Sequence, residues 1–220
     1  TSDILPGQTE SVDDLGTGPH TMAVDESGRV LFFADLDGST ASDGVIYLDD
    51  TLLAQEGSAS PVAGRNWLSL SSPELDLDVD GGYVYSGSLD GDSASNLVII
   101  RNGVKFRQEG DEPPAGVEPG AAITSFGSGP VKINARGEVL WFADWDGPTG
   151  TDTALFLDDK LLVREGVTQI GGLTVNALRG ITDGYTMSPD GRFILFEAEL
   201  VGGTEGAFLI EIEEGQWNDV

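Results

Sequence analysis

The sequence predicts an all-β fold, a four-bladed β-propeller of four-stranded antiparallel repeats of about 54 residues each. Three observations predict it. A hairpin pattern occurs four times, and its turn glycines, Gly28, Gly81, Gly137 and Gly191, are 53, 56 and 54 residues apart. The 31 Gly and 10 Pro residues recur between short apolar runs, which is typical of many strands joined by tight turns. No helical 3.6-residue apolar pattern of useful length is present.

The first two strands of each repeat are clearest around Gly137. A short alternating strand ends at Ile133, a turn follows, and a second strand begins at Val139. Three residues before each turn glycine stands a side chain that can accept a hydrogen bond from the backbone two residues on, and these residues are Asp25, Asp78, Asn134 and Ser188. We interpret these acids as turn chemistry and not as catalytic groups.

The remaining strands follow in order. The second strands are apolar on both faces, which predicts that protein covers both sides of each sheet, and they include residues 30–34, 139–143 and 193–196. Third strands are predicted at residues 45–48, 97–100, 154–157 and 207–210. Fourth strands at 52–56, 104–109 and 161–165 each end in Glu-Gly.

The repeat spacing predicts one repeat domain over residues 1–220. Its expected blades are residues 22–73, 74–129, 130–184 and 185–220. Residues 1–21 then look like the tail of a preceding blade, and we expect them to pair with the last blade and close the ring. Two alternatives stay open: the segment is a frayed leader, or it completes a blade of a neighbouring chain by strand exchange.

The composition restricts the partners. The chain has 11 Lys and Arg against 38 Asp and Glu, a net charge of −27, which opposes binding to nucleic-acid phosphates. Such acidity suits either a high-salt or a cation-rich exterior, and the sequence does not separate the two. Cysteine is absent, and no apolar run is long enough for a membrane span.

A family resemblance rests on three features. These are the Asn134-x-x-Gly137 turn before an apolar strand, the Glu-Gly after each fourth strand, and Ser72-Pro73 or Gly129-Pro130 before the next repeat. In these the chain resembles the bacterial tandem-repeat, choice-of-anchor cell-surface proteins, named for an Asn-x-x-Gly-x-x-Ala-Phe motif. It departs from the motif in three repeats, where Asp or Ser replaces Asn, and Ala-Phe is replaced in all four. The resemblance implies an extracellular or cell-surface location and no assigned enzymatic activity.

The loops between second and third strands hold the best candidate ligands. Each of two loops carries Asp-x-Asp-Gly with a third Asp six residues on, namely Asp35, Asp37, Asp43 and Asp144, Asp146, Asp152. Calcium takes six to eight oxygen ligands, so these loops are candidate calcium sites. The alternative is that they are solvated turns on an acidic surface.

Two tryptophans are candidate ligand or partner contacts. Trp67 lies in a connection between repeats and Trp145 in an acidic loop, where an aromatic ring could stack on a sugar or meet a protein. Packing beneath the loops is the alternative for both.

The catalytic inventory is small. His20 is the only histidine, which leaves a single place for a histidine-based triad, and no pair of carboxylates stands out for glycoside hydrolysis. The sequence therefore favours a non-catalytic structural or protein- or glycan-binding module at the cell surface. The alternatives are a calcium-dependent, lectin-like propeller and a carboxylate-based glycoside hydrolase.

Overall fold

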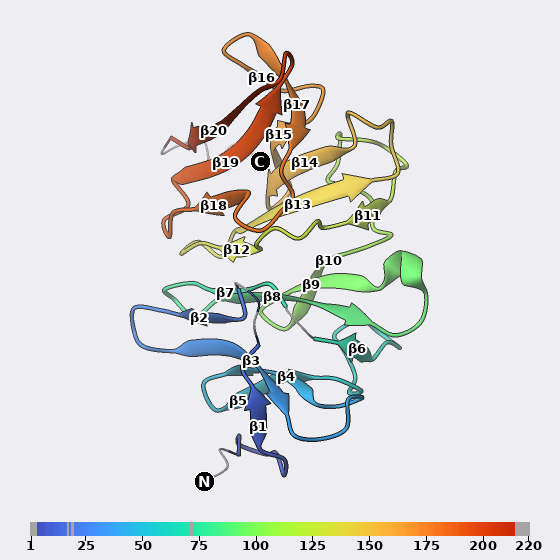
Figure 1. Cartoon of the computed structure of the whole chain (residues 1–220), viewed down its shortest axis with the longest axis vertical. Coiled ribbons are helices and arrows are strands. Elements are labelled where there is room, and N and C mark those ends of the chain that lie inside the picture. Colours follow the sequence, from blue (N-terminus) through green and yellow to red (C-terminus); the bar gives the residue numbers. More distant parts are fainter. Residues whose placement is uncertain (1–3, 17, 19, 71–72, 214–220) are drawn as a thin grey trace. The chain divides into compact units, whose positions relative to one another are not determined.

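The computed structural model describes residues 4–16, 18, 20–70 and 73–213, and over these it consists of four antiparallel sheets (Figure 1). The all-β prediction is confirmed. One 3-10 turn, η1 (Ser93–Ser95), interrupts the strands. The chain divides into two compact units, Thr1–Asp111 and Glu112–Val220, and each unit contains two of the sheets.

All four sheets share one plan, in which a long central strand has two short strands end to end along one side and a third strand along the other. The central strands are β3 (Val30–Leu36), β8 (Tyr83–Leu89), β13 (Val139–Trp145) and β19 (Phe193–Leu200). The short pairs are β1 (Val12–Asp14) with β2 (Met22–Val24), β6 (Trp67–Ser69) with β7 (Leu75–Leu77), β11 (Ile123–Ser125) with β12 (Lys132–Ile133), and β17 (Leu173–Leu178) with β18 (Tyr185–Met187).

The outer strands complete three of the sheets. The third strands are β4 (Gly44–Leu48), β9 (Leu97–Arg101), β14 (Thr153–Leu157) and β20 (Thr204–Glu211). Fourth strands pair with the first three of these, as β5 (Thr51–Gln55), β10 (Val104–Gln108) and β15 (Lys160–Arg164). A two-residue strand, β16 (Gln169–Ile170), pairs with β17.

The expectation that residues 1–21 complete the last blade is wrong for the part of the segment that the structure describes. Val12 pairs with Leu36 in the first sheet, as strand β1 against β3, and the Asp37 amide donates to the Ser11 carbonyl at 2.8 Å. Equivalent hydrogen bonds run from the Asp90 amide to the Asn66 carbonyl and from the Asp146 amide to the Ala122 carbonyl, each at 3.0 Å. They recur because each connection between repeats contains a short strand that pairs in the sheet of the repeat that follows. The N-terminal segment therefore belongs to the first sheet.

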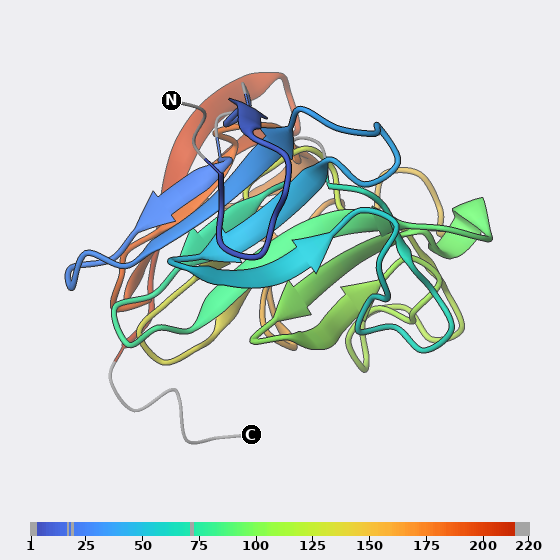
Figure 2. The same cartoon turned by 90° about the horizontal axis from the view of Figure 1, so that it is seen from below.

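The N-terminal segment also covers the outer face of this sheet. Leu5 and Val12 pack against a small core cluster that includes Tyr47. The Tyr47 hydroxyl donates to the Pro6 carbonyl at 2.7 Å and accepts from the Gln8 side-chain amide at 3.1 Å. Figure 2 shows the segment, in dark blue, across the strands of the first sheet. The first sheet is thereby covered on the side that would otherwise face solvent.

The predicted turn chemistry is confirmed. The Asp25 carboxylate accepts from the Ser27 and Arg29 amides, both at 2.9 Å, and the Asn134 side-chain oxygen accepts from the Arg136 amide at 2.9 Å. Asp78 makes the equivalent bonds, whereas the shorter Ser188 accepts from the Phe193 amide at 2.9 Å. These side chains close the hairpins because they occupy backbone donors that would otherwise be unpaired.

Each unit contains one large apolar core between its two sheets. In the first unit β2 and β7 lie side by side, and the core joins Leu31 and Ile46 of one sheet to Trp67 and Tyr85 of the other. In the second unit β14 lies beside β17, and its core extends from Leu140 and Leu155 to Val175, Ile194 and Phe196. Burial on both faces of the second strands, as predicted, is complete in β13, where only Asp144 is not buried.

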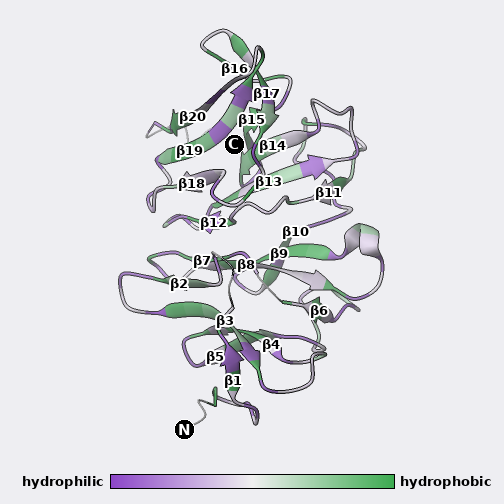
Figure 3. Cartoon of the chain, in the orientation of Figure 1, coloured by the Kyte–Doolittle hydropathy of each residue, from purple (hydrophilic) through white to green (hydrophobic). Residues whose placement is uncertain are grey.

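The fourth sheet departs from this rule. Along β19 buried and more exposed residues alternate, and its outward positions include the exposed Leu195 and Glu197. Figure 3 shows the same strand as alternating hydrophobic and hydrophilic bands. Among the described residues no strand pairs with the far edge of β20. The last seven residues of the predicted fourth blade lie outside the described part of the chain.

Candidate functional site

The acidic loops bring together only part of each predicted calcium set. Burial raises the pKa of Asp35, and the nearby charges of Asp43, Asp13 and Asp14 raise it further. These groups repel one another in their ionised forms. Asp13 and Asp14 were missed from the sequence because their segment was assigned to the last blade and not to this sheet.

The second acidic loop repeats the arrangement. Burial raises the pKa of Asp144, and the charges of Asp152 and Glu165 add to this effect. Glu165 was also missed. Its place directly after the fourth strand could have indicated it, because the end of that strand pairs with the start of β14, next to this loop.

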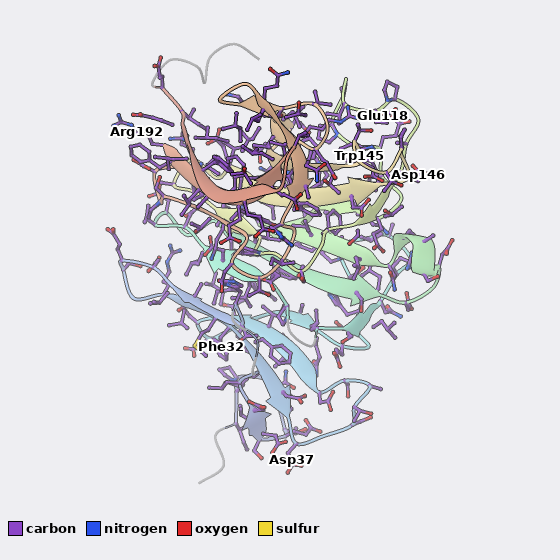
Figure 4. The ribbon with its side chains drawn as sticks, turned by 45° about the horizontal axis from the view of Figure 1, so that its top comes forward. Phe32, Asp37, Glu118, Trp145, Asp146 and Arg192 are labelled. Atoms are coloured by element: carbon purple, nitrogen blue, oxygen red, sulfur yellow. The ribbon has the colours of Figure 1, made fainter. Side chains whose placement is uncertain are left out.

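The middle acid of the second loop has a structural task. A carboxylate oxygen of Asp146 accepts from the Ala122 amide at 2.5 Å, and Asp90 accepts from the Asn66 amide at 2.9 Å in the same way. Both side chains fix the short strand that enters beside the central one. Figure 4 places Asp146 beside Trp145, at the end of β13.

The structure gathers no group of three or more His, Asp or Glu side chains suited to a metal ion among its described residues. The calcium sites predicted at Asp35, Asp37, Asp43 and at Asp144, Asp146, Asp152 stay predictions without a geometric counterpart.

The prediction that Trp67 and Trp145 present aromatic surface to a ligand is wrong. Trp67 is 2% exposed and Trp145 1% exposed. The Trp67 ring lies 5.8 Å from that of Tyr85, and the Arg164 guanidinium lies 5.2 Å from the centre of the Trp145 ring. Both tryptophans belong to strands, where alternation turns these residues into the core, so neither ring can stack on a glycan in this arrangement.

The Glu-Gly signature is explained by the glutamate side chain. Glu56 is 7% exposed, and its two carboxylate oxygens accept from the Gly44 amide at 3.4 Å and from the Leu70 amide at 2.7 Å. Glu109 accepts from the Leu97 amide at 3.0 Å, and burial raises its pKa. These glutamates hold the start of the third strand, and Glu56 also fixes the chain entering the next sheet.

The glycine of the signature is required by a close backbone contact. Gly166 has a φ of +68°, and a Cβ atom built on it would lie 2.2 Å from the Gly150 carbonyl oxygen. Gly57 has a φ of +74°, and the same atom would lie 2.8 Å from the Ala41 oxygen. The loop after the second strand passes directly over this turn, so only glycine fits.

The outer face of the fourth sheet is the best candidate for a functional surface. Leu195 and Leu209 lie opposite each other on β19 and β20 and are 44% and 62% exposed. Ion pairs flank them, from Arg192 to Glu211 at 2.6 Å and from Arg179 to Glu205 at 2.5 Å. Figure 4 shows Arg192 at the margin of its unit.

A hollow of about 230 Å³ lies at one end of this face, lined by Arg179, Glu197, Ala198, Glu205, Gly206 and Ala207. Within the described chain the Glu197 carboxylate has neither a hydrogen bond nor an ion pair. Two carboxylates therefore face one guanidinium, so the hollow is suited to a basic group.

Comparison with known proteins assigns no family. No protein-family model matches the chain, and no curated protein matches it. Among the described residues, no helix is long and apolar enough to cross a membrane.

Proposed function

We propose that the chain is a non-catalytic extracellular or cell-surface repeat module that acts in structural assembly or in protein or glycan binding. One observation supports this most strongly: the fourth sheet leaves Leu195 and Leu209 of its outer face, and a strand edge, uncovered among the described residues. An open sheet edge with an exposed apolar face is a template for another chain. The repeated acids, in contrast, mostly serve as hydrogen-bond acceptors within the sheets.

The finer fold belongs to the same proposal. Four sheets of one plan, in chain order and in four consecutive repeats, are consistent with four propeller blades. The cell-surface location rests on the resemblance to the choice-of-anchor repeat proteins in the Asn134-x-x-Gly137 turn and the Glu-Gly signature. Cell fractionation with an antibody to the chain tests the location, and recovery of the protein in the cytoplasmic fraction alone would contradict it.

The second alternative, a carboxylate-based glycoside hydrolase, has a defined test. Burial raises the pKa of both Asp35 and Asp144, and a raised pKa is the property of a general acid. We expect no turnover on a broad panel of aryl glycosides at pH 4 to 8. Turnover that is lost in Asp144→Asn or in Asp35→Asn would refute the non-catalytic proposal.

A calcium-dependent lectin is the other alternative. A glycan array probed with the labelled chain, with calcium and with a chelator, separates it from a calcium-independent module. Binding that requires calcium and is lost in Asp144→Asn would favour the lectin.

A further inference from the structure

We propose that the free edge of β20 binds, by β-strand addition, an extended segment whose apolar centre is flanked by basic side chains. The inference rests on the proposed function, since it names the kind of partner by which the module assembles. The partner is a strand supplied by a polypeptide other than a second copy of this chain.

The other three sheets show which element pairs with the equivalent edge. Their third strands β4, β9 and β14 all pair with a fourth strand, antiparallel, on the side away from the central strand. In the described part of the fourth sheet β20 occupies the same position, with β19 on one side and no strand on the other. Among the described residues one place in a fourfold repeated plan is thus unfilled.

The backbone of β20 is arranged to accept a strand. The Ile212 amide donates to the Arg192 carbonyl of the preceding hairpin at 2.8 Å. Backbone groups alternate in direction along a strand, so those of Glu205, Ala207, Leu209 and Glu211 point away from β19. All eight residues of β20 pair with β19 in unbroken register, and β20 contains no lysine, proline or bulge of the kinds that protect edge strands.

The side chains of the same face define the chemistry of the guest. Leu195 and Leu209 form its apolar centre, and an acidic residue lies toward each end, Glu211 at one and Glu197 at the other. Arg179 already pairs with Glu205, whereas the Glu197 carboxylate has no partner among the described residues. A guest with basic residues around an apolar centre would bury the leucines and bring a positive charge within reach of Glu197.

Two of the chain's own three fourth strands have this composition. β10 and β15 carry Lys105, Arg107, Lys160 and Arg164, four of the 11 basic residues. If a segment with the sequence of β15 lay antiparallel on β20 with Leu162 opposite Leu209, Lys160 would lie opposite Glu211. Arg164 would lie opposite Ala207, whose partner on the other side is Glu197, so its long side chain could reach across Ala207 to that carboxylate.

The other face of the guest would meet the core side. In this register Leu161 and Val163 lie opposite Ile210 and Phe208, which are partly buried and pack on the core of the second unit. The sequence of β15 therefore matches β20 on both faces, and it is the probe for the test.

A fluorescein-labelled peptide with the sequence of residues 159–166, added to the full chain, tests the proposal by fluorescence anisotropy. We expect saturable binding of one peptide per chain. N-methylation of the Leu162 amide should abolish binding, because that amide would donate to β20. N-methylation of the Val163 amide, which would point away, should leave the affinity within about twofold. Replacing both basic residues by Glu should weaken binding about tenfold or more, in proportion to the two lost charge pairs.

Variants of the chain provide the second arm. Ala207→Pro removes one outward amide, which a proline at an edge tolerates, so binding should be lost while the melting temperature is kept. Glu197→Gln should weaken binding severalfold, whereas Glu26→Gln, which removes the same charge from an exposed turn in the other unit, should not.

Several results would overturn the proposal. Equal affinity for the two methylated peptides would show that the ladder does not form, as would no saturable binding. Binding only to a chain shortened after Glu213 would assign the edge to the chain's own last residues. A dimer that Ala207→Pro converts to a monomer would assign it to a second copy. Each of these results would overturn the proposed strand addition at β20 without contradicting the proposed non-catalytic function. Glycoside turnover, measured separately, would refute that function.

Discussion

Alanine substitutions in the Glu-Gly turns should destabilise the protein in the order of their backbone contacts. A Cβ atom would lie 2.2 Å from a carbonyl oxygen at Gly166, 2.8 Å at Gly57 and 3.5 Å at Gly110. All three positions have positive φ, between +68° and +84°, so they share a backbone strain of about 1–2 kcal/mol for alanine. The lower entropy of the unfolded alanine variant offsets about 0.4–1 kcal/mol of this.

The steric contact separates the three variants. At 3.5 Å the contact is ordinary, so Gly110→Ala should cost only the net strain, about 1 kcal/mol. At Gly166 the obstacle is a backbone oxygen of a loop held by the bond from the Thr151 amide to the Pro148 carbonyl, so overpacking adds about 1–3 kcal/mol. We expect Gly166→Ala to lose about 2–4 kcal/mol in total and Gly57→Ala to fall between.

Urea unfolding followed by tryptophan fluorescence measures these differences, because Trp67, Trp141 and Trp145 are buried and report on both units. Gly171→Ala is the matched control for Gly166→Ala, since its φ is +59° and a Cβ atom there would meet nothing within 4 Å. Equal losses in Gly166→Ala and Gly171→Ala would refute the steric explanation and leave backbone strain alone.

Three further predictions concern the acids. Glu56→Gln should lower the free energy of unfolding in urea by about 1–3 kcal/mol, because the glutamine NH2 group would face one of the two backbone N–H groups that the glutamate now accepts from. Glu26→Gln should change the free energy of unfolding little. At Asp25 burial opposes ionisation, but hydrogen bonds from Ser27 and Arg29, together with the Arg29 charge, outweigh burial and lower the pKa from 3.8 to about 2. Because the folded protein favours the ionised carboxylate, the stability that Asp25 contributes above pH 4 should be lost as the pH falls toward 2. Asp25→Asn should flatten this acid limb of a melting-temperature profile, and an unchanged limb would contradict the assignment. Millimolar calcium should raise the melting temperature no more than sodium chloride at equal ionic strength, and a calcium-specific rise lost in Asp144→Asn would support the predicted ion site.

Sequence reasoning found the parts of the fold that repeat as local patterns. The hairpin turns could be predicted because each of Asp25, Asp78 and Asn134 bonds to backbone within four residues, which is visible as a spacing. The short strands β1, β6 and β11 were missed, since each is three residues long and lies in a connection without alternation. Each pairs with the C-terminal end of a central strand that lies about 20 residues further along the chain, so no local pattern indicates the pairing.

The candidate site was harder to predict for the same reason. Trp67 and Trp145 look exposed in sequence because they stand beside acids and turns, yet both lie on strand positions that face the core. The outer face of the fourth sheet could not be found, since Leu195 and Leu209 have the same apolar character as their buried counterparts in other repeats. Only the absence of a covering layer among the described residues makes them exposed.

The bond from Leu70 to Glu56 changes where one repeat ends and the next begins. Glu56 belongs to the turn that closes the first sheet, and Leu70 follows β6, a strand of the second. Counted by hairpin glycines, a repeat would be cut near residue 73, which would separate β6 from its partner β8. A cut after Gly57, like the division at Asp111, keeps every strand with its sheet. An engineer who adds, removes or exchanges repeats in this chain should therefore join them directly after the Glu-Gly pair, 16 to 19 residues before the periodicity suggests.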